Sequence, residues 1–373
     1  MMTVEDARRQ FPHTWTDMIY LNHAAISPMS FRVRNAVDAY LERRALKGIE
    51  PIPWAVTMLQ DTKKIIAGLL GTTPDRIAFC LNTSEALSIV AEGYPWQSGD
   101  RILLYKYEFP TNVYPFLNQE RKGVAVDFFD APDGRITPEV VAANLRPETK
   151  MFSLSAVQFL TGYRADLEAI GKLCSARDII FCVDSIQRFP YLPIDVERMH
   201  IDVLANGSHK WMMSPEGVSF LYINTKTQGK INQPAMGWTS VKNPFDPFNY
   251  SVDRLRDEAS RYESGTMNFS GIAGLQASLK FFEEFGFAEM ERRTMELSGL
   301  LIELLERYGA EVITPKHERG AIVTISFDDA KATFERLEKK NVIASLRAGK
   351  LRFAPYFYTT EEEVRKAVSI LFE

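Results

Sequence analysis

The chain has 373 residues, of which 46% are hydrophobic and 25% charged, and its formal net charge is −4. This composition is typical of a soluble globular protein with room for one large and one smaller domain, and the charge speaks against a broad nucleic-acid-binding surface. No apolar run is long enough to span a bilayer, and residues 1–10 contain no signal-peptide core. We therefore expect a cytoplasmic protein with no membrane or nucleic-acid partner.

Short apolar runs alternate with amphipathic helical patterns along much of the chain. This alternation predicts a mostly parallel seven-stranded sheet with helices on both faces. The loop before the last run is too short for a parallel crossover, so we expect that strand to be antiparallel. The Pro-rich stretch at 49–54 is expected to be a rigid surface loop. The runs that predict strands are 76–81, 101–106, 124–129, 151–157, 178–183, 202–207 and 217–223.

After about residue 255 the pattern changes. A helix-rich stretch at 270–308 is followed by the strand-like "AIVTISF", a helical pattern at 329–341, "KLRFAPYFY" and a final helix. This order predicts a smaller α+β domain. We assign residues 16–255 to a large α/β domain, and residues 1–15 with 256–373 to the small one.

The cysteines and histidines give no metal signature. Cys80, Cys174 and Cys182 form neither a disulfide pattern nor a close-spaced metal motif. Cys80 and Cys182 fall in strand-like runs, where a thiol behaves as a small buried hydrophobe. The five histidines show no ligand spacing, so we expect no metal site.

Polar side chains follow several of the predicted strands. Ligands of open α/β sheets gather at the carboxyl ends of the strands, so these side chains are expected to converge on one crevice. They are Thr83, Ser84, Glu108, Phe109, Asn112, Gln158, Asp184, Gln187, Ser208, His209 and Lys210.

Each signal has a structural alternative when taken alone. Thr83 and Ser84 open a helix whose N-terminus suits a phosphate, or they belong to a simple cap. Asp184 is a carboxylate that needs a cation or several donors, or it is also a cap. Lys210 is a nucleophilic amine with a lowered pKa, or a lysine that extends its ammonium to solvent.

Together these groups describe one ligand, a phosphorylated pyridine aldehyde. The phosphate suits the helix N-terminus, and the aldehyde can form a Schiff base with Lys210. The Asp184 carboxylate would keep the ring nitrogen protonated, so that the ring can act as an electron sink. Phe109 offers a flat face for the ring, and Gln187 is placed to bond its phenolic oxygen.

The sequence also resembles the class V aminotransferases, which are fold-type I enzymes that use pyridoxal phosphate. The resemblance runs from "IYLNHAAISP" (19–28) to "LRFAPYFYTTEEEV" (351–364), and "DSIQ" through "GSHKW" is its most specific part. The segments "WQSGDRILLYKYEFPTNVYPF" and "SAVQFLTGYRADLEAIG" are similar to the isopenicillin N epimerase-like branch.

The resemblance implies a role for each matching residue. Lys210 would carry the cofactor, Asp184 would pair with its pyridine nitrogen and Gln187 with its phenolate. Residues implied to hold the phosphate are Thr83, Ser84 and His209, with Thr266 reaching it from the neighbouring subunit of a homodimer with shared active sites. Gln158 would lie near the ring, Asn112 would support the wall, Arg352 with help from Arg347 would bind the substrate carboxylate, and Asn22 and His23 would line the substrate side.

Three positions depart from the desulfurases of this family. Phe109 replaces a histidine that stacks on the ring, and Gly207 replaces a serine three residues before the lysine, which makes a phosphate contact by Ser208 doubtful. The segment "RAGKLR" (347–352) has no cysteine where desulfurases carry their persulfide cysteine. We therefore predict that the protein is not a persulfide-forming cysteine desulfurase.

The predicted function is that of a transferase or isomerase acting at the α-carbon of an amino acid or related amine, of aminotransferase or epimerase type. One alternative is a cysteine or selenocysteine lyase without a persulfide cysteine. The other is a non-catalytic pyridoxal-phosphate-binding protein, against which the presence of both Lys210 and Arg352 speaks.

Overall fold

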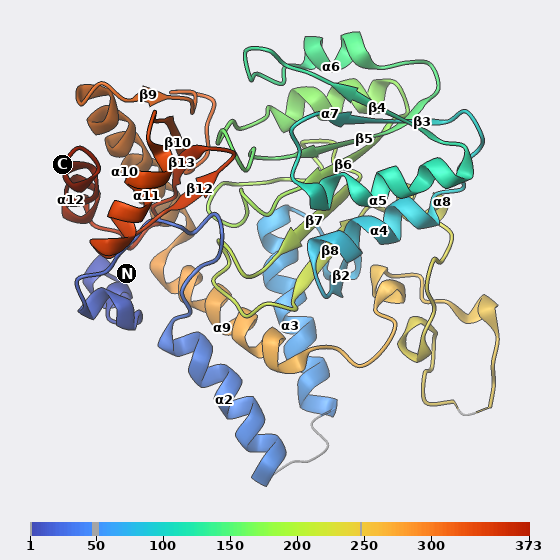
Figure 1. Cartoon of the computed structure of the whole chain (residues 1–373). Coiled ribbons are helices and arrows are strands. Elements are labelled where there is room, and N and C mark those ends of the chain that lie inside the picture. Colours follow the sequence, from blue (N-terminus) through green and yellow to red (C-terminus); the bar gives the residue numbers. More distant parts are fainter. Residues whose placement is uncertain (1, 47–51, 247) are drawn as a thin grey trace.

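A computed structural model describes residues 2–46, 52–246 and 248–373. Seven strands form one sheet in the order β2-β8-β7-β6-β5-β3-β4 (Figure 1). All seven match the apolar runs expected from the sequence, so the predicted sheet is confirmed. The strands are β2 (Ile77–Cys80), β3 (Arg101–Tyr105), β4 (Ala125–Phe129), β5 (Thr149–Ser155), β6 (Ile180–Asp184), β7 (Val203–Gly207) and β8 (Ser219–Ile223).

The sheet is mixed in the way that its loop lengths require. β7, β6, β5, β3 and β4 run parallel to one another. β8 is antiparallel to both β7 and β2, because the short connection after β7 can only turn the chain back. The carboxyl ends of β5, β6 and β7 therefore lie side by side at one edge of the sheet.

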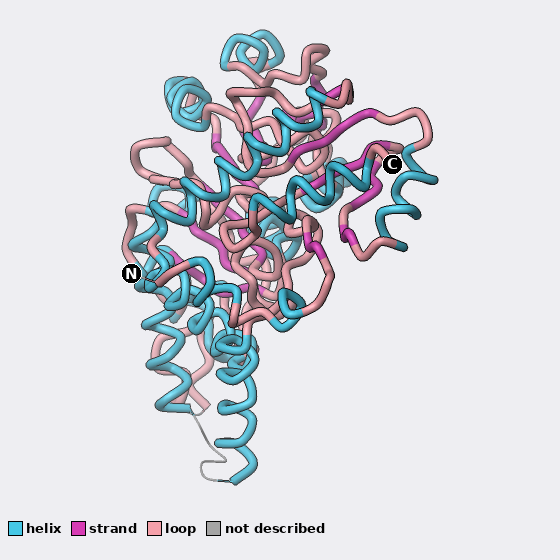
Figure 2. Tube along the Cα trace, turned by 90° about the vertical axis from the view of Figure 1, so that its left-hand side faces the viewer, coloured by secondary structure: helices cyan, strands magenta, loops and turns pink. Residues whose placement is uncertain are grey.

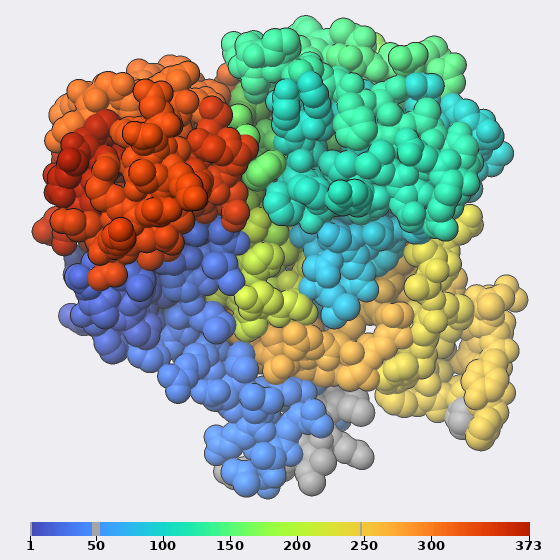
Figure 3. Space-filling view, viewed as in Figure 1, coloured from blue at the N-terminus to red at the C-terminus, as the bar shows by residue number. Residues whose placement is uncertain are grey.

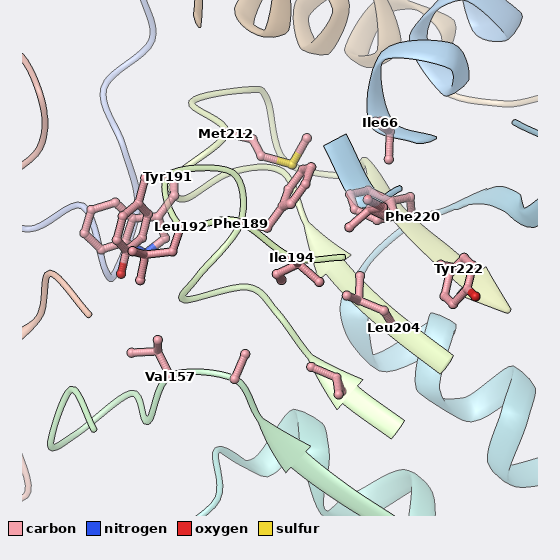
Figure 4. Packing of buried hydrophobic residues seen from close by; sticks show 14 of the residues in the cluster. Ile66, Val157, Phe189, Tyr191, Leu192, Ile194, Leu204, Met212, Phe220 and Tyr222 are labelled. Atoms are coloured by element: carbon pink, nitrogen blue, oxygen red, sulfur yellow. The ribbon is translucent and has the colours of Figure 1, made fainter. Parts of the chain in front are cut away.

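Both faces of the sheet are covered by helices, and alternate residues of each strand enter different cores. One core contains Phe79, Leu204 and Phe220, and a close view of it is given in Figure 4. Side chains from α3 (Ile52–Leu70), α6 (Pro138–Asn144) and α7 (Leu167–Ala176) pack into it. The other core contains Cys80 and Cys182 with side chains from α4 (Thr83–Gly93) and α5 (Tyr114–Leu117). Burial on both faces explains the continuous apolar runs of these strands.

Three long helices pack below the sheet. They are α2 (Phe31–Leu46), α3 and α9 (Phe269–Phe285), and Figures 1 and 2 show α2 and α3 projecting from one end of the molecule. Of the loop expected at 49–54, residues 49–51 lie outside the described part. Residues 52–54 begin α3, so the loop prediction is wrong there, because proline is tolerated in the first turn of a helix.

The C-terminal part has a core of its own. Its four-stranded sheet has the order β12-β13-β10-β9, and the short β1 (Ile19–Tyr20) pairs in parallel with β11 (Val342–Ile343).

The bounds of the other α-helices and strands, in chain order, are α1 (Val4–Arg8), α8 (Thr225–Lys230), α10 (Phe287–Arg307), β9 (Glu311–Val312), β10 (Val323–Ser326), α11 (Ala330–Lys339), β12 (Ser345–Arg347), β13 (Lys350–Phe353) and α12 (Glu361–Leu371).

The division of the chain at residues 15 and 255 stays a prediction. Apolar side chains of α9, among them Leu275 and Leu279, belong to the same core as the large sheet.

In the described part of the chain, no helix is both long enough and apolar enough to cross a membrane.

Two helical glycines give a matched test of this packing. A Cβ on Gly171 of α7 would lie 1.9 Å from the carbonyl oxygen of Met199, whereas a Cβ on Gly68 of α3 would meet nothing within 4 Å. We expect Gly171→Ala to lower the free energy of unfolding by about 1–3 kcal/mol through overpacking. Gly68→Ala should be neutral or stabilising by up to about 1 kcal/mol. Denaturant unfolding of both variants checks this, and equal stabilities would contradict the packing described for α7.

Candidate active site

A cavity of about 300 Å³ opens at the carboxyl ends of β5, β6 and β7. The space-filling view shows a hollow between the C-terminal part and the α4–α5 side of the molecule, floored by residues from the middle of the sequence (Figure 3). The structure therefore brings together most of the residues singled out from the sequence. The cavity is lined by Ala24, Ala25, Asn82, Thr83, Ser84, Phe109, Thr111, Phe159, Asp184, Ile186, Gln187, His209, Lys210, Arg347 and Arg352.

Lys210 and Asp184 are buried charged groups that line the cavity. Burial lowers the pKa of the Lys210 amine, the Asp184 carboxylate opposes that effect, and the cations Arg352 and Arg347 add to it. Burial likewise raises the pKa of Asp184, against a hydrogen bond that it accepts from the Ile186 N–H at 3.0 Å. The amine nitrogen of Lys210 lies 5.4 Å from the centre of the Phe109 ring.

The N-terminus of α4 supplies donors on one side of the cavity. The Asn82 side chain accepts a hydrogen bond from the Glu85 N–H at 2.9 Å, which caps the helix. Ser84 Oγ lies 3.0 Å from Thr111 Oγ1. Among the described residues, Thr83 Oγ1 is buried without a hydrogen-bond partner. An unpaired buried hydroxyl at a helix N-terminus is suited to an anion such as phosphate.

Steric contacts explain why a glycine, Gly207, stands three residues before Lys210. A Cβ on Gly207 would lie 2.9 Å from Ile186 Cδ1 and 3.0 Å from Thr83 Oγ1. A serine at this position would crowd the Thr83 hydroxyl. The Ser208 hydroxyl instead donates within its own loop, to the carbonyls of Pro215 and Val218 at 3.1 and 2.7 Å, and Ser208 does not line the cavity.

Gln187 is held by two hydrogen bonds. Its amide nitrogen donates to the Ala24 carbonyl at 2.9 Å, and its amide oxygen accepts from the Trp211 indole at 2.8 Å. These partners fix which end of the amide carries the nitrogen, and the second N–H remains able to donate to an oxygen in the cavity. Burial lowers the pKa of His209, which lines the cavity beside Lys210.

Gln158 lies behind the lining residues rather than among them. It donates to Glu108 at 2.8 Å, and Glu108 also accepts from the Ser155 N–H at 2.8 Å and from the Ser155 hydroxyl. Burial raises the pKa of the Glu108 carboxyl. Asn112 accepts from the Ser153 hydroxyl at 2.5 Å. These bonds tie the segment after β3 to β5 and to the residues that follow β5.

Arg352 is buried on β13 and reaches the cavity from the C-terminal part. It donates to the Phe159 carbonyl at 2.6 Å and weakly to Ser345 Oγ at 3.5 Å. Its Nε is buried with no hydrogen-bond partner among the described residues. Burial lowers the pKa of Arg352 to about 10, so it is still a cation at neutral pH.

Arg347 ends β12 and is exposed. Ala348 and Gly349 make the turn to β13, with φ values of 47° and 72°, and Arg347 pairs with Lys350. This is a tight two-residue hairpin. The segment 347–352, which contains no cysteine, therefore includes a short turn between two strands.

Asn22 and His23 lie outside the lining of the cavity, where Ala24 and Ala25 stand instead. His23 is fully buried, with its ring nitrogens 2.8 Å from the Ala354 carbonyl and 2.9 Å from the Tyr358 hydroxyl. Burial lowers its pKa to about 3. Asn22 accepts from the Ser345 hydroxyl. Neither side chain lines the cavity, and the substrate contacts predicted for Asn22 and His23 stay a prediction.

Thr266 also lies outside the Lys210 cavity. It lines two other cavities, of about 180 and 250 Å³, together with Glu263, Gly265 and Met267. Its predicted contact is with the cofactor of a neighbouring subunit, and that contact stays a prediction.

Phe159 is a lining residue that the sequence reasoning missed. Its ring packs edge-on against Phe109, with the ring centres 5.2 Å apart. It directly follows Gln158, so its place after β5 was the available signal. Thr111 and Asn82 lie in segments that the sequence had marked as polar strand ends.

The family model for class V aminotransferases matches residues 19–366. The chain therefore belongs to the class V aminotransferase family, and its cofactor is pyridoxal phosphate. The unpaired Thr83 hydroxyl, the buried Lys210 amine and the buried Asp184 carboxylate fit that cofactor's phosphate, aldehyde and pyridine nitrogen.

Curated relatives carry several different names. A probable cysteine desulfurase of Methanothermobacter thermautotrophicus is 28% identical, over 83% of this chain and 78% of its own length. An uncharacterized aminotransferase of Bacillus subtilis is 25% identical over 98% and 96%. An isopenicillin N epimerase of Amycolatopsis lactamdurans is 26% identical over 85% of each chain.

Solved structures share the whole fold. The apo cysteine desulfurase of Thermococcus onnurineus superposes with a TM-score of 0.90 at 24% identity, over 100% of this chain and 98% of that one. The cystine C–S lyase C-DES, solved as a mutant with glycine linked to its pyridoxal phosphate, gives 0.90 at 23% identity over 98% and 99%. These likenesses establish a fold-type I enzyme architecture.

The lowered pKa of Lys210 makes a kinetic prediction. Only the neutral amine attacks an aldehyde, so covalent capture of pyridoxal phosphate by the apoprotein should accelerate with pH through a midpoint well below the ordinary lysine value of about 10.4. In Asp184→Asn the midpoint should move lower, because the carboxylate that stabilises the ammonium is gone. Stopped-flow absorbance across pH measures both, and a wild-type midpoint near the ordinary value would contradict the burial of Lys210.

Proposed function

We propose that the protein is a pyridoxal-phosphate-dependent enzyme that acts at the α-carbon of an α-amino acid, with an aminotransferase-type reaction. The observation that carries this proposal is the buried Arg352, whose Nε has no partner, in the same cavity as Lys210 and Asp184. Bound pyridoxal phosphate supplies an electron sink that lowers the barrier to breaking a bond at the α-carbon.

Lys210 serves as the base and acid in this proposal. Its lowered pKa lets the amine accept a proton from the α-carbon at neutral pH and return it to a nearby atom. Asp184, held by the Ile186 N–H, keeps a proton at the pyridine nitrogen. Thr83, Ser84 and His209 bind the phosphate, and Gln187 donates to the phenolate oxygen.

Among the described residues that line the cavity, Lys210 is the one that this proposal leaves to act as a base, and this favours transamination over epimerisation. The side facing Lys210 is formed by the ring of Phe109 with Phe159 packed against it, and neither can donate a proton. Of the other titratable lining residues, Asp184 is assigned to the ring nitrogen and His209 to the phosphate, while the two arginines remain charged. Moving a proton along one face needs only Lys210, whereas epimerisation by two bases needs a second group.

Arg352 binds the substrate carboxylate in this proposal. A carboxylate would supply the acceptor that Nε lacks, in the forked geometry that guanidinium and carboxylate share. Arg347 adds positive charge at the exposed end of the same hairpin. A protein that only stores the cofactor has no use for a buried guanidinium whose Nε has no partner, which argues against the non-catalytic alternative.

Arg352→Lys tests this assignment. The variant should lose about 1.5–3 kcal/mol of binding to amino acids, or roughly tenfold to a hundredfold in kcat/KM, while amines without a carboxylate change little. The measurement is a panel of L- and D-amino acids and matched decarboxylated amines, followed by the cofactor spectrum and product analysis. Equal losses for both classes would mean that Arg352 only supports the hairpin and Phe159.

A second candidate is a lyase that releases sulfur or selenium by elimination. The desulfurase names of several relatives favour it. Elimination would need the cofactor and Lys210 but no thiol on the chain.

All three cysteines are buried, and burial raises the pKa of Cys174 to about 12 and those of Cys80 and Cys182 well above the usual value. A persulfide-forming desulfurase is therefore excluded from the proposal.

Incubation with L-cysteine in the absence of other thiols separates these possibilities. We expect no sulfur adduct on the protein by intact mass, whether or not sulfide is released. Sulfide release with pyruvate as product would favour the lyase, and formation of the pyridoxamine form of the cofactor would favour the aminotransferase. A stoichiometric persulfide, lost on replacement of one of the three cysteines, would contradict the exclusion.

The proposed assembly is a homodimer with shared active sites, in which Thr266 of each chain reaches the phosphate in its neighbour. Thr266 is exposed and lies away from its own cavity, which supports this assignment. Cytoplasmic localisation stays a prediction.

A further inference from the structure

A buried ion pair lies outside the Lys210 cavity. Lys63 of α3 and Glu263 are joined at 2.7 Å, with side-chain exposures of only 2% and 9%. The Lys63 ammonium also lies 5.9 Å from the centre of the Phe79 ring. Burying two charges is expensive, and an apolar pair of the same size is often at least as stable. The pair therefore calls for a role other than stability.

Glu263 accepts a hydrogen bond from the backbone of a strand at the edge of the large sheet. β2 is an edge strand that pairs with β8 and with no other strand of the described residues, and its Phe79 N–H donates to the Glu263 carboxylate at 2.8 Å. Lys63 binds the same carboxylate oxygen. Glu263 is thus fixed to both α3 and β2 at once.

The segment after Glu263 is held on both sides of Thr266. On the far side, Asn268 donates to the Gly217 carbonyl at 3.2 Å and accepts from the Gly271 N–H at 3.0 Å, which caps α9. The Thr239 hydroxyl donates to the Glu263 carbonyl, and a Cβ on Gly237 would lie 1.6 Å from the Ser264 carbonyl oxygen. Beyond this point the segment runs between two cavities, both lined by Glu263, Gly265, Thr266 and Met267. Because Thr266 lines both cavities, its placement depends on the anchors on either side of it, and of these Glu263 is buried whereas Asn268 is partly exposed.

We propose that Lys63 and Glu263 are a positioning pair that sets Thr266 for the phosphate of the cofactor in the neighbouring subunit. The Glu263 carboxylate is buried, whereas Thr266, three residues later, is exposed. From the buried pair, the segment therefore runs toward the surface of its own chain. This inference rests on the proposed function, since it requires a dimer with shared sites.

The first test compares pyridoxal phosphate with pyridoxal, which lacks the phosphate. In Lys63→Met/Glu263→Gln, both charges are removed together and the shape is kept. The apoprotein variant should bind pyridoxal phosphate about tenfold or more weakly, the size expected for one lost hydrogen bond to a charged group, and pyridoxal as well as before. Thr266→Ala should give the same pattern.

The opposite edge of the sheet provides a matched control. Arg101 of β3 and Asp127 of the edge strand β4 form an ion pair that is joined by two hydrogen bonds, each 2.6 Å long. Arg101→Met/Asp127→Asn should leave the affinities for both ligands unchanged. Equal losses for pyridoxal and pyridoxal phosphate in the Lys63/Glu263 variant would show a general structural role and overturn the proposal.

A coupling measurement tests whether the pair acts through Thr266. Adding Thr266→Ala to the Lys63/Glu263 variant should weaken pyridoxal phosphate binding no further, because both changes remove the same contact. A loss equal to the sum of the two separate losses would overturn the proposal.

Hybrid dimers test whether the pair acts across subunits. Lys210→Ala chains are mixed with chains of the Lys63/Glu263 variant, at a cofactor concentration that leaves each homodimer empty. One site of the hybrid combines Lys210 of one chain with the intact segment of the other, so borohydride should trap cofactor in hybrids alone. Absence of trapping in hybrids, while the wild type traps cofactor on Lys210, would overturn the inference and leave the proposed function standing. A wild type that traps none on Lys210 would overturn the proposed function itself.

Discussion

The site depends on the burial of one amine and one carboxylate in the same cavity. Removal from water disfavours the charged form of each, so burial drives the pKa of Lys210 down and that of Asp184 up. Their mutual attraction opposes both shifts. The balance leaves an amine that can be neutral near physiological pH beside a carboxylate that can still be ionised, and the cofactor of this family needs both.

The rest of the structure keeps these two groups in place and makes room beside them. Parallel β6 and β7 deliver Asp184 and Lys210 to the same edge of the sheet. Gly207 leaves space for the Thr83 hydroxyl, and the Trp211 indole orients Gln187. The C-terminal part adds Arg352, so the cavity is completed only when the two parts of the chain pack together.

The sheet could be predicted because strands buried on both faces leave continuous apolar runs, and the polar residues that end those runs mark the crevice. Sequence could not show that Phe159 lines the cavity while Gln158 binds Glu108, because the order of two adjacent residues does not reveal which side chain faces the cavity. Nor could sequence show that both ring nitrogens of His23 have partners within the chain, the Ala354 carbonyl and the Tyr358 hydroxyl. The proline at 53 suggested a loop, although α3 accommodates it in its first turn.

The central claim is that Lys210 carries the cofactor. The most direct measurement is borohydride reduction of the holoenzyme, followed by proteolysis and mass mapping of the pyridoxyl group. The account predicts that the label lies on Lys210 alone, at one per chain, and that Lys210→Ala protein is not labelled. Labelling of a different lysine, or no labelling of the wild type after reconstitution with pyridoxal phosphate, would contradict it.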